Sequence, residues 1–245
     1  RYIAFRKLES VLQSEALFFC RADKFPDPYE GAVPEREAEH RVKEQIRIMR
    51  WVGQEVDYEV AKEKADALRN LQRNLRTRII INCWHINDHE SDLMWQSYLK
   101  DNEGVALKSD TARIKQSFRK TDYDVRIGKV RYIDYEKDIF FDEEEYPHDK
   151  MNTSIPFVHK RKEFKHENEY RAIVDVDSDS PRYDWSDEPH RKGKKINVDV
   201  EALIDEVVLH PSSTDQFKQC VEEAVRSSDV SVDVRKSEMD RTPQF

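Results

Sequence analysis

The sequence predicts an α+β protein with a mixed, largely antiparallel sheet. Short apolar runs, several of them alternating with charged residues, indicate strands, and segments with apolar residues every three or four positions indicate helices. The chain of 245 residues has only five glycines and lacks a Gly-rich phosphate loop, which disfavours the nucleotide-binding folds built around such a loop. Without an internal repeat or a low-complexity linker, residues 1–245 are expected to form one domain.

The expected elements follow from these patterns. A short helix that ends near Ser14 should place Leu8, Val11 and Leu12 on one face. Residues 123–127 and 129–133 are expected to pair as strands across a turn or bulge at Gly128. Other expected strands are 2–5, 16–20, 79–84, 105–107, 196–200, 207–209 and 230–234, and other expected helices are 93–99, 112–118, 154–164 and 217–225.

Residues 34–76 are rich in Glu, Lys, Arg, Ala and Leu, with apolar residues at helical spacing. We expect a helical insertion of two helices, broken near Gly53, within the single domain. Residues 236–245 are expected to form a frayed tail.

Composition indicates a soluble protein. Charged residues make up 38% of the chain, and no apolar run approaches the roughly 18 residues that cross a bilayer. The first residues do not have the pattern of a signal peptide. Whether further residues precede Arg1 stays open. The net charge of −8 argues against a surface that is basic throughout, although a local basic groove stays open. Cys20, Cys83 and Cys220 have neither disulfide nor zinc spacing, so a cytoplasmic location is the default.

The segment around Glu167, Glu169 and Arg171 is the strongest candidate for a functional site. Its charged residues alternate with Tyr170 and Ala172, which predicts a strand with two carboxylates and a guanidinium on one side. A solvated strand face with ion pairs explains the same pattern.

Two other stretches carry candidate residues. Asp27, Tyr29 and Glu30 lie in a proline-framed turn, which is either a structural turn or a supporting loop of a site. An aromatic stripe with Trp95 and Tyr98 is either core or a ligand platform, and Trp84 at the end of a buried strand is expected to meet it.

Together these residues resemble a known set. Arg1-Tyr2, Asp27-Pro28-Tyr29-Glu30, Cys83-Trp84, Met94-Trp95-x-x-Tyr98, Gly104 and Glu167-x-Glu169-Tyr170-Arg171 resemble the prokaryotic "domain of unknown function 2971" family over roughly residues 1 to 210. This family implies a fold neighbourhood and not an activity.

The order of elements also resembles the ADP-ribosyltransferase fold, especially its DNA- and RNA-modifying bacterial toxin branch, although no Ser-Thr-Ser element follows a middle strand. This resemblance implies NAD as substrate and no metal. Glu169 would be the catalytic carboxylate, Glu167 would orient or deprotonate the acceptor, and Arg171 would hold Glu169 ionised or contact a phosphate. The cofactor-binding residues would be Arg1, Tyr2, Trp84, Trp95 and Tyr98, together with Arg171.

The resulting hypothesis is an NAD-dependent ADP-ribosyltransferase-like enzyme, a toxin or antiviral effector that modifies nucleic acid or protein. It predicts that Arg1, Trp84, Trp95, Tyr98 and Glu169 converge on one cleft. One alternative is a metal-dependent nuclease or phosphodiesterase with Asp27, Glu30, Glu167 and Glu169 around Mg²⁺. Another is a non-catalytic binding module that meets a protein partner through residues 34–76.

Overall fold

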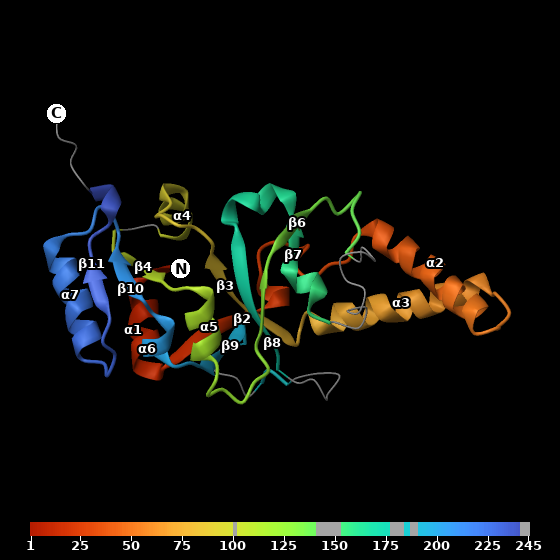
Figure 1. Cartoon of the computed structure of the whole chain (residues 1–245), viewed down its shortest axis with the longest axis horizontal. Helices are drawn as coiled ribbons and strands as arrows, with labels where there is room; N and C mark the ends of the chain where they lie inside the picture. Colours follow the sequence, from red (N-terminus) through yellow and green to blue (C-terminus); the bar gives the residue numbers. More distant parts are fainter. Residues whose placement is uncertain (100–101, 141–152, 177–183, 187–190, 241–245) are drawn as a thin grey trace. The chain divides into compact units, whose positions relative to one another are not determined.

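The computed structural model describes residues 1–99, 102–140, 153–176, 184–186 and 191–240 (Figure 1). The chain divides into two compact units. The first consists of Arg1–Phe19, Cys83–Val125 and Lys195–Phe245, and the second of Cys20–Asn82 and Arg126–Lys194. Whether these units form the single domain predicted from the sequence stays a prediction.

The first unit is built on a four-stranded sheet. Its strands β1 (Tyr2–Ala4), β4 (Gly104–Lys108), β10 (Glu206–Leu209) and β11 (Asp233–Arg235) lie in the order β1-β4-β10-β11. Neighbours are antiparallel except β10 and β11, and Tyr2 pairs with Ala106. Helices α1 (Phe5–Ser14), α4 (Asp92–Tyr98), α5 (Thr111–Ser117), α6 (Val200–Leu203) and α7 (Asp215–Arg226) belong to this unit, as does the 3₁₀ helix η4 (Glu238–Asp240).

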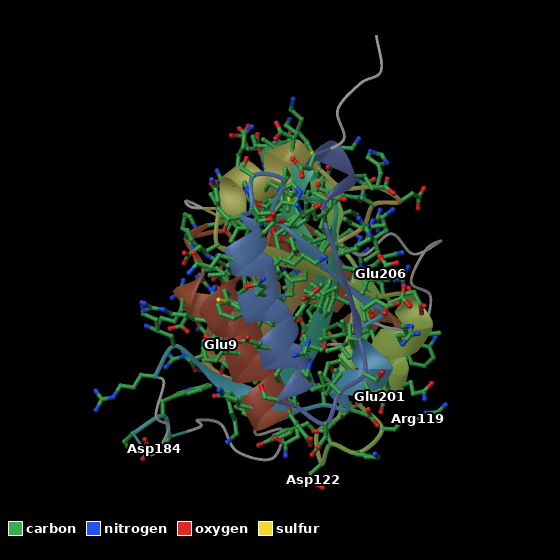
Figure 2. The ribbon with its side chains drawn as sticks, turned by 90° about the vertical axis from the view of Figure 1, so that its left-hand side faces the viewer. Glu9, Arg119, Asp122, Asp184, Glu201 and Glu206 are labelled. Atoms are coloured by element: carbon green, nitrogen blue, oxygen red, sulfur yellow. The ribbon has the colours of Figure 1, made fainter. Side chains whose placement is uncertain are left out.

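Helices α1 and α7 lie side by side, as Figure 2 shows from a second direction. Each buries one apolar face: Leu8, Val11 and Leu12 on α1, and Phe217, Val221 and Val225 on α7. These spacings of three or four residues place the apolar side chains on one side of each helix. The labelled Glu9 of α1 and Glu201 of α6 are among the charged side chains of this unit (Figure 2).

The second unit combines a helical hairpin with two sheets. Helices α2 (Glu35–Trp51) and α3 (Tyr58–Leu75) form the hairpin. Residues of β5 (Arg126–Lys129), β8 (Glu169–Asp175), β3 (Ile79–His85), β2 (Ala16–Arg21) and β9 (Gly193–Asn197) form a sheet in that order. Strands β6 (Arg131–Ile133) and β7 (His159–Arg161) pair in parallel. The 3₁₀ helices are η1 (Ala22–Lys24), η2 (Ile155–Val158) and η3 (Lys162–Glu167).

The structure confirms the α+β class, with mostly antiparallel strand pairs. The two helices expected within residues 34–76 are present, and Gly53 lies between them with a positive φ of 72°. Residues Ile79–Ile81 of β3 are buried, as the continuous apolar run predicts. Asp110, Ser91 and Thr214 cap α5, α4 and α7 through their side chains.

Two local predictions are wrong. Gly128 is not a turn between paired strands, because it lies inside β5, which pairs with β8, while β6 pairs with β7. A Cβ at Gly128 would lie 3.2 Å from Val158, so the glycine allows a close approach of the chains. The helix expected at 154–164 is also absent. Residues His159–Arg161 form β7 and pair with β6, and the 3₁₀ helices η2 and η3 lie on either side of this strand.

The C-terminal segment differs from the expected frayed tail over residues 236–240. Ser237 is buried, and its Oγ donates to Oε2 of Glu90 at 2.5 Å. The backbone N–H of Glu238 donates to Oε1 of the same carboxylate. Glu90 thus fixes this segment to the residues before α4. Residues 241–245 of the predicted tail lie outside the described residues.

In the parts of the chain that the structure describes, no helix combines the length and the apolar character needed to span a bilayer.

Candidate functional site

Five charged side chains gather in the interior of the second unit. They are the carboxylates of Glu30, Glu167 and Glu169, the ammonium of Lys160 and the guanidinium of Arg171, and we call them the buried charge cluster. Glu30 follows η1, Lys160 lies on β7, Glu167 ends η3, and Glu169 and Arg171 lie on β8. The strand face that carries Glu169 and Arg171 is therefore buried and not solvated, and the interpretation as an exposed ion-paired face is wrong.

Arg171 is fully buried and binds both Glu30 and Glu169. Its two terminal nitrogens donate to the two carboxylate oxygens of Glu30 at 2.6 and 3.0 Å, and Nε donates to Oε2 of Glu169 at 2.6 Å. A further N–H donates to the carbonyl of Phe157 at 2.7 Å. This bidentate geometry satisfies the guanidinium within the protein. Arg171 therefore positions carboxylates here and does not present its donors to a phosphate.

Lys160 connects Glu169 to the third carboxylate, that of Glu167. Its Nζ donates to Oε2 of Glu167 and to Oε1 of Glu169, the latter at 3.1 Å. Asn168, between the two glutamates, adopts a left-handed conformation with φ 38°, which ends η3 before β8 begins. The predicted strand thus starts at Glu169. The two glutamates still meet at one cation, although only Glu169 belongs to the strand.

The cluster separates the pKa values of its carboxyl groups. Burial raises the pKa of Glu167 to about 7, and its hydrogen bond with Glu169 acts in the same direction. Burial also acts to raise the pKa of Glu169, but Arg171, the bond with Glu167 and Lys160 outweigh it and lower the pKa to about 2. One carboxyl group therefore exchanges its proton near neutral pH, and its neighbour stays ionised.

The loop that carries Asp27 and Tyr29 has both structural and exposed residues. Oδ1 of Asp27 accepts from the backbone N–H of Tyr29 at 3.1 Å, and the carboxylate pairs with Arg161 at 3.0 Å. The Arg161 guanidinium lies 4.8 Å from the centre of the Tyr29 ring, whose residue is 42% exposed. Asp27 is therefore buried in a structural role, while Tyr29 reaches solvent.

The aromatic candidates of the first unit separate into core and surface. Trp95 is 1% exposed and packs edge-on against Tyr2, with ring centres 4.7 Å apart. Its indole N–H donates to Oε2 of Glu90 at 3.3 Å. Tyr98 is 50% exposed, so Trp95 and Tyr98 do not form one stripe. Trp95 has the environment of a core residue.

Arg1 and Trp84 make a second grouping in the first unit. The Arg1 guanidinium lies 5.9 Å from the centre of the Trp84 ring. Within the described residues it has no carboxylate partner, and the buried indole N–H of Trp84 has no acceptor. The guanidinium of Arg1 and the indole N–H of Trp84 are thus two donor groups close to each other.

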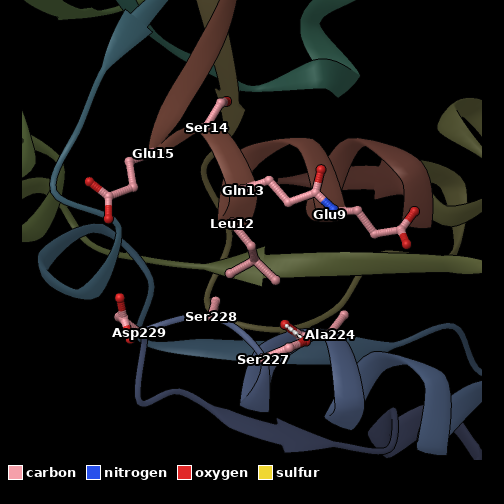
Figure 3. A pocket seen from close by; sticks show the side chains of 9 residues that line it. All are labelled: Glu9, Leu12, Gln13, Ser14, Glu15, Ala224, Ser227, Ser228 and Asp229. Carbon is pink, nitrogen blue, oxygen red and sulfur yellow. Dashed lines mark hydrogen bonds between the residues drawn. The ribbon is translucent and has the colours of Figure 1, made fainter.

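The candidates predicted to share a cleft are distributed over both units. Arg1, Tyr2, Trp84, Trp95 and Tyr98 belong to the first unit, and all the others to the second. Their convergence stays a prediction. In the first unit, a hollow of about 510 Å³ lies between α1 and the end of α7, with Glu9, Glu15 and Asp229 among its lining residues (Figure 3). None of the candidate residues lines it.

Sequence patterns missed three residues that shape the cluster. Lys160 was expected on a helix, yet it bridges both glutamates. The hydroxyl of Tyr132 accepts from the backbone N–H of Glu169 at 2.8 Å. His159, next to Lys160, is fully buried. Alternation of His159 and Arg161 around Lys160 is the only local signal, and three residues are too few to distinguish a strand.

The described structure defines an α+β protein whose second unit carries a buried pair of glutamates between two cations. A family described as "Protein of unknown function (DUF2971)" matches residues 94–172, so this part of the chain is similar to that family. This confirms the resemblance predicted from the sequence, over a shorter range than residues 1 to 210. No match was found among curated proteins or among solved structures.

His159 predicts a pH-dependent stability. Burial lowers its pKa to about 4 from 6.5, because the ring is fully buried and its charged form loses solvation. The hydrogen bond between Nδ1 and the carbonyl of Ile155, 2.7 Å long, acts in the opposite direction and is outweighed. Since the folded-state pKa is below the unfolded value, this contribution is complete above pH 6.5 and is lost as pH falls towards 4. It amounts to about 3 kcal/mol. Urea unfolding should show a shallower pH dependence for His159→Asn in this range, whereas the exposed-site control His166→Asn should follow the wild type.

Proposed function

We propose that the chain is an ADP-ribosyltransferase-like enzyme that uses NAD as substrate. The observation that carries the proposal is the Glu167–Glu169 pair, in which one carboxyl group has a pKa of about 7 and the other of about 2. Reactions at a glycosidic carbon commonly use two carboxyl groups with such separated pKa values.

The pair suits cleavage of the bond between ribose and nicotinamide. The electron pair of this bond leaves with nicotinamide, and positive charge develops on the ribose. Ionised Glu169, held by Lys160 and Arg171, would stabilise that charge at short range. The acceptor oxygen or nitrogen then attacks the ribose carbon, and Glu167 would take the acceptor's proton.

The two glutamates differ in burial, and this difference assigns a role to each of them. The side chain of Glu167 is 16% exposed and that of Glu169 only 5%, and both oxygens of Glu169 already bind cations. Glu167 is therefore the member of the pair that would contact substrate. Glu169 would act through its charge, and Arg171 would position it.

The free donors of Arg1 and Trp84 support a site for NAD. A guanidinium and an indole N–H without acceptors in the described chain match the phosphates and the carboxamide of this substrate. Tyr98 is 50% exposed and would stack on the nicotinamide ring. The acceptor is nucleic acid or protein, as for a toxin or antiviral effector that works in the cytoplasm.

The magnesium alternative is less well supported, because Lys160 occupies the position between Glu167 and Glu169. Glu30 is likewise bound by Arg171 through both oxygens. Within the described residues, no group of three or more His, Cys, Asp or Glu side chains is arranged to hold a metal ion. The carboxylates that a nuclease would use are thus bound to protein cations.

Release of nicotinamide from labelled NAD tests the proposal. We expect Glu167→Gln and Glu169→Gln to reduce release by about a hundredfold or more, because the first removes the base and the second the stabilising charge. Glu163→Gln is the matched control, since Glu163 is exposed on the same 3₁₀ helix as Glu167. The proposal is wrong if the wild type releases no nicotinamide with nucleic-acid or protein acceptors and NAD does not raise its melting temperature.

A further inference from the structure

Exposed apolar side chains concentrate at the end of the α2–α3 hairpin. Of the large apolar residues that the described chain exposes, most lie on these two helices and their connection. Trp51 is 86% exposed, the highest value among them. We call residues 48–60 the hairpin tip; its exposed apolar side chains are Ile48, Trp51, Val52, Val56, Tyr58 and Val60.

The hairpin itself does not cover these side chains. Among the side chains of the hairpin that the structure describes, the buried apolar ones are Met49, Ala61, Ala65 and Leu75, and two of these are alanines with little apolar area. Figure 1 shows α2 and α3 side by side, with their connecting turn at the end away from β6, β7 and β8 of the same unit. Two helices alone cannot bury their apolar faces, and helical hairpins reach a closed core when four helices pack together.

The charges of the tip are complementary between the two helices. Arg50 near the end of α2 is basic, while Glu55 and Glu59, before and within the first turn of α3, are acidic. In the described part of the chain, none of these three side chains makes an ion pair, and all are exposed. A two-fold arrangement that sets α2 of one copy against α3 of another would bring these opposite charges together twice.

We propose that the hairpin tip is a self-association surface, through which two copies of this chain form a four-helix bundle. Trp51 lies at the centre of the interface, and Arg50 of each copy faces Glu59 of the other. A membrane surface is a poorer occupant, since the tip carries Glu55, Asp57 and Glu59 against one exposed arginine and would be repelled by anionic lipids. This inference is independent of the proposed activity.

Sedimentation equilibrium of the full chain, from micromolar to near-millimolar concentrations, tests the proposal. The wild type should be a reversible dimer, and Trp51→Glu should raise the dissociation constant by roughly thirtyfold or more. Leu93→Glu is the matched control, because Leu93 is 50% exposed on α4 of the first unit, and it should leave the dimer unchanged. Circular dichroism should show equal helix content in all three proteins.

A charge-swap experiment tests the pairing itself. Arg50→Glu alone and Glu59→Arg alone should each weaken self-association, whereas an equimolar mixture of the two variants should form a heterodimer. A wild type that is monomeric throughout, or a dimer that survives Trp51→Glu, overturns the proposal. Failure of the mixture to associate overturns the Arg50–Glu59 pairing, and binding of the wild-type monomer to anionic vesicles through Trp51 would assign the tip to a lipid surface instead.

Discussion

Arg171→Met is expected to lower the free energy of unfolding by about 3–5 kcal/mol, since it leaves two buried carboxylates without their shared cation. Glu30 loses both hydrogen bonds that Arg171 donates to it, and Glu169 loses the bond from Nε of Arg171 while it keeps the one from Lys160. Methionine fills much of the same volume, so the loss reports the charges rather than a cavity. Urea-induced unfolding, followed by tryptophan fluorescence, measures the difference.

Two further variants make this prediction specific. Arg69→Met is the control, because the Arg69 side chain on α3 is 48% exposed. This change should alter stability by less than about 0.5 kcal/mol. Glu30→Gln combined with Arg171→Met should cost less than the sum of the single changes, because the two side chains bind each other. Simple additivity would show that Arg171 and Glu30 are not coupled as the structure indicates.

Lys160→Met is expected to destabilise the protein by about 3 kcal/mol near pH 8 and by clearly less near pH 5. Without Lys160, the folded-state pKa of Glu167 rises further above its ordinary value of 4.5. A raised folded-state pKa favours folding where the group is protonated, and that contribution is lost as pH rises. The deficit relative to the wild type therefore grows with pH.

Unfolding in urea at both pH values measures this deficit. Lys162→Met is the control, because the Lys162 side chain is 55% exposed and pairs with Asp134 at the surface. It should change stability by less than about 0.5 kcal/mol at either pH. An equal deficit for Lys160→Met at both pH values would contradict the expected rise in the folded-state pKa of Glu167.

The fold was predictable where a local pattern decides it. The apolar stripe of α1, the continuous run in β3 and the charged helices of residues 34–76 each have a period that belongs to one structure. Prediction failed where a distant partner decides. Residues 159–161 form a strand only because β6 lies beside them, and Gly128 joins β5 through its pairing with β8.

The site was predictable in composition but not in environment. Alternation identified Glu169 and Arg171 as neighbours on one face, and the structure joins them at 2.6 Å. The burial of the face depends on Glu30, which is 141 residues from Arg171, and on Lys160, whose segment was expected to be a helix. The structure also places Trp95 in the core, the more common of the two environments that an aromatic spacing alone leaves open.

The imbalance of charges in the buried cluster connects folding with the uptake of a proton. Three carboxyl groups face only two cations, so full ionisation would leave one uncompensated negative charge in the interior. Burial raises the pKa of Glu30 and that of Glu167, the latter to about 7, so folding between pH 4.5 and about 7 draws a proton from solution into the cluster. The second unit thus stores one exchangeable proton in the buried charge cluster, where the side chain of Glu167 is more accessible than that of Glu169. A bound ligand that brings its own positive charge to Glu167 would release this proton, and calorimetry in buffers of different ionisation enthalpy would record the release.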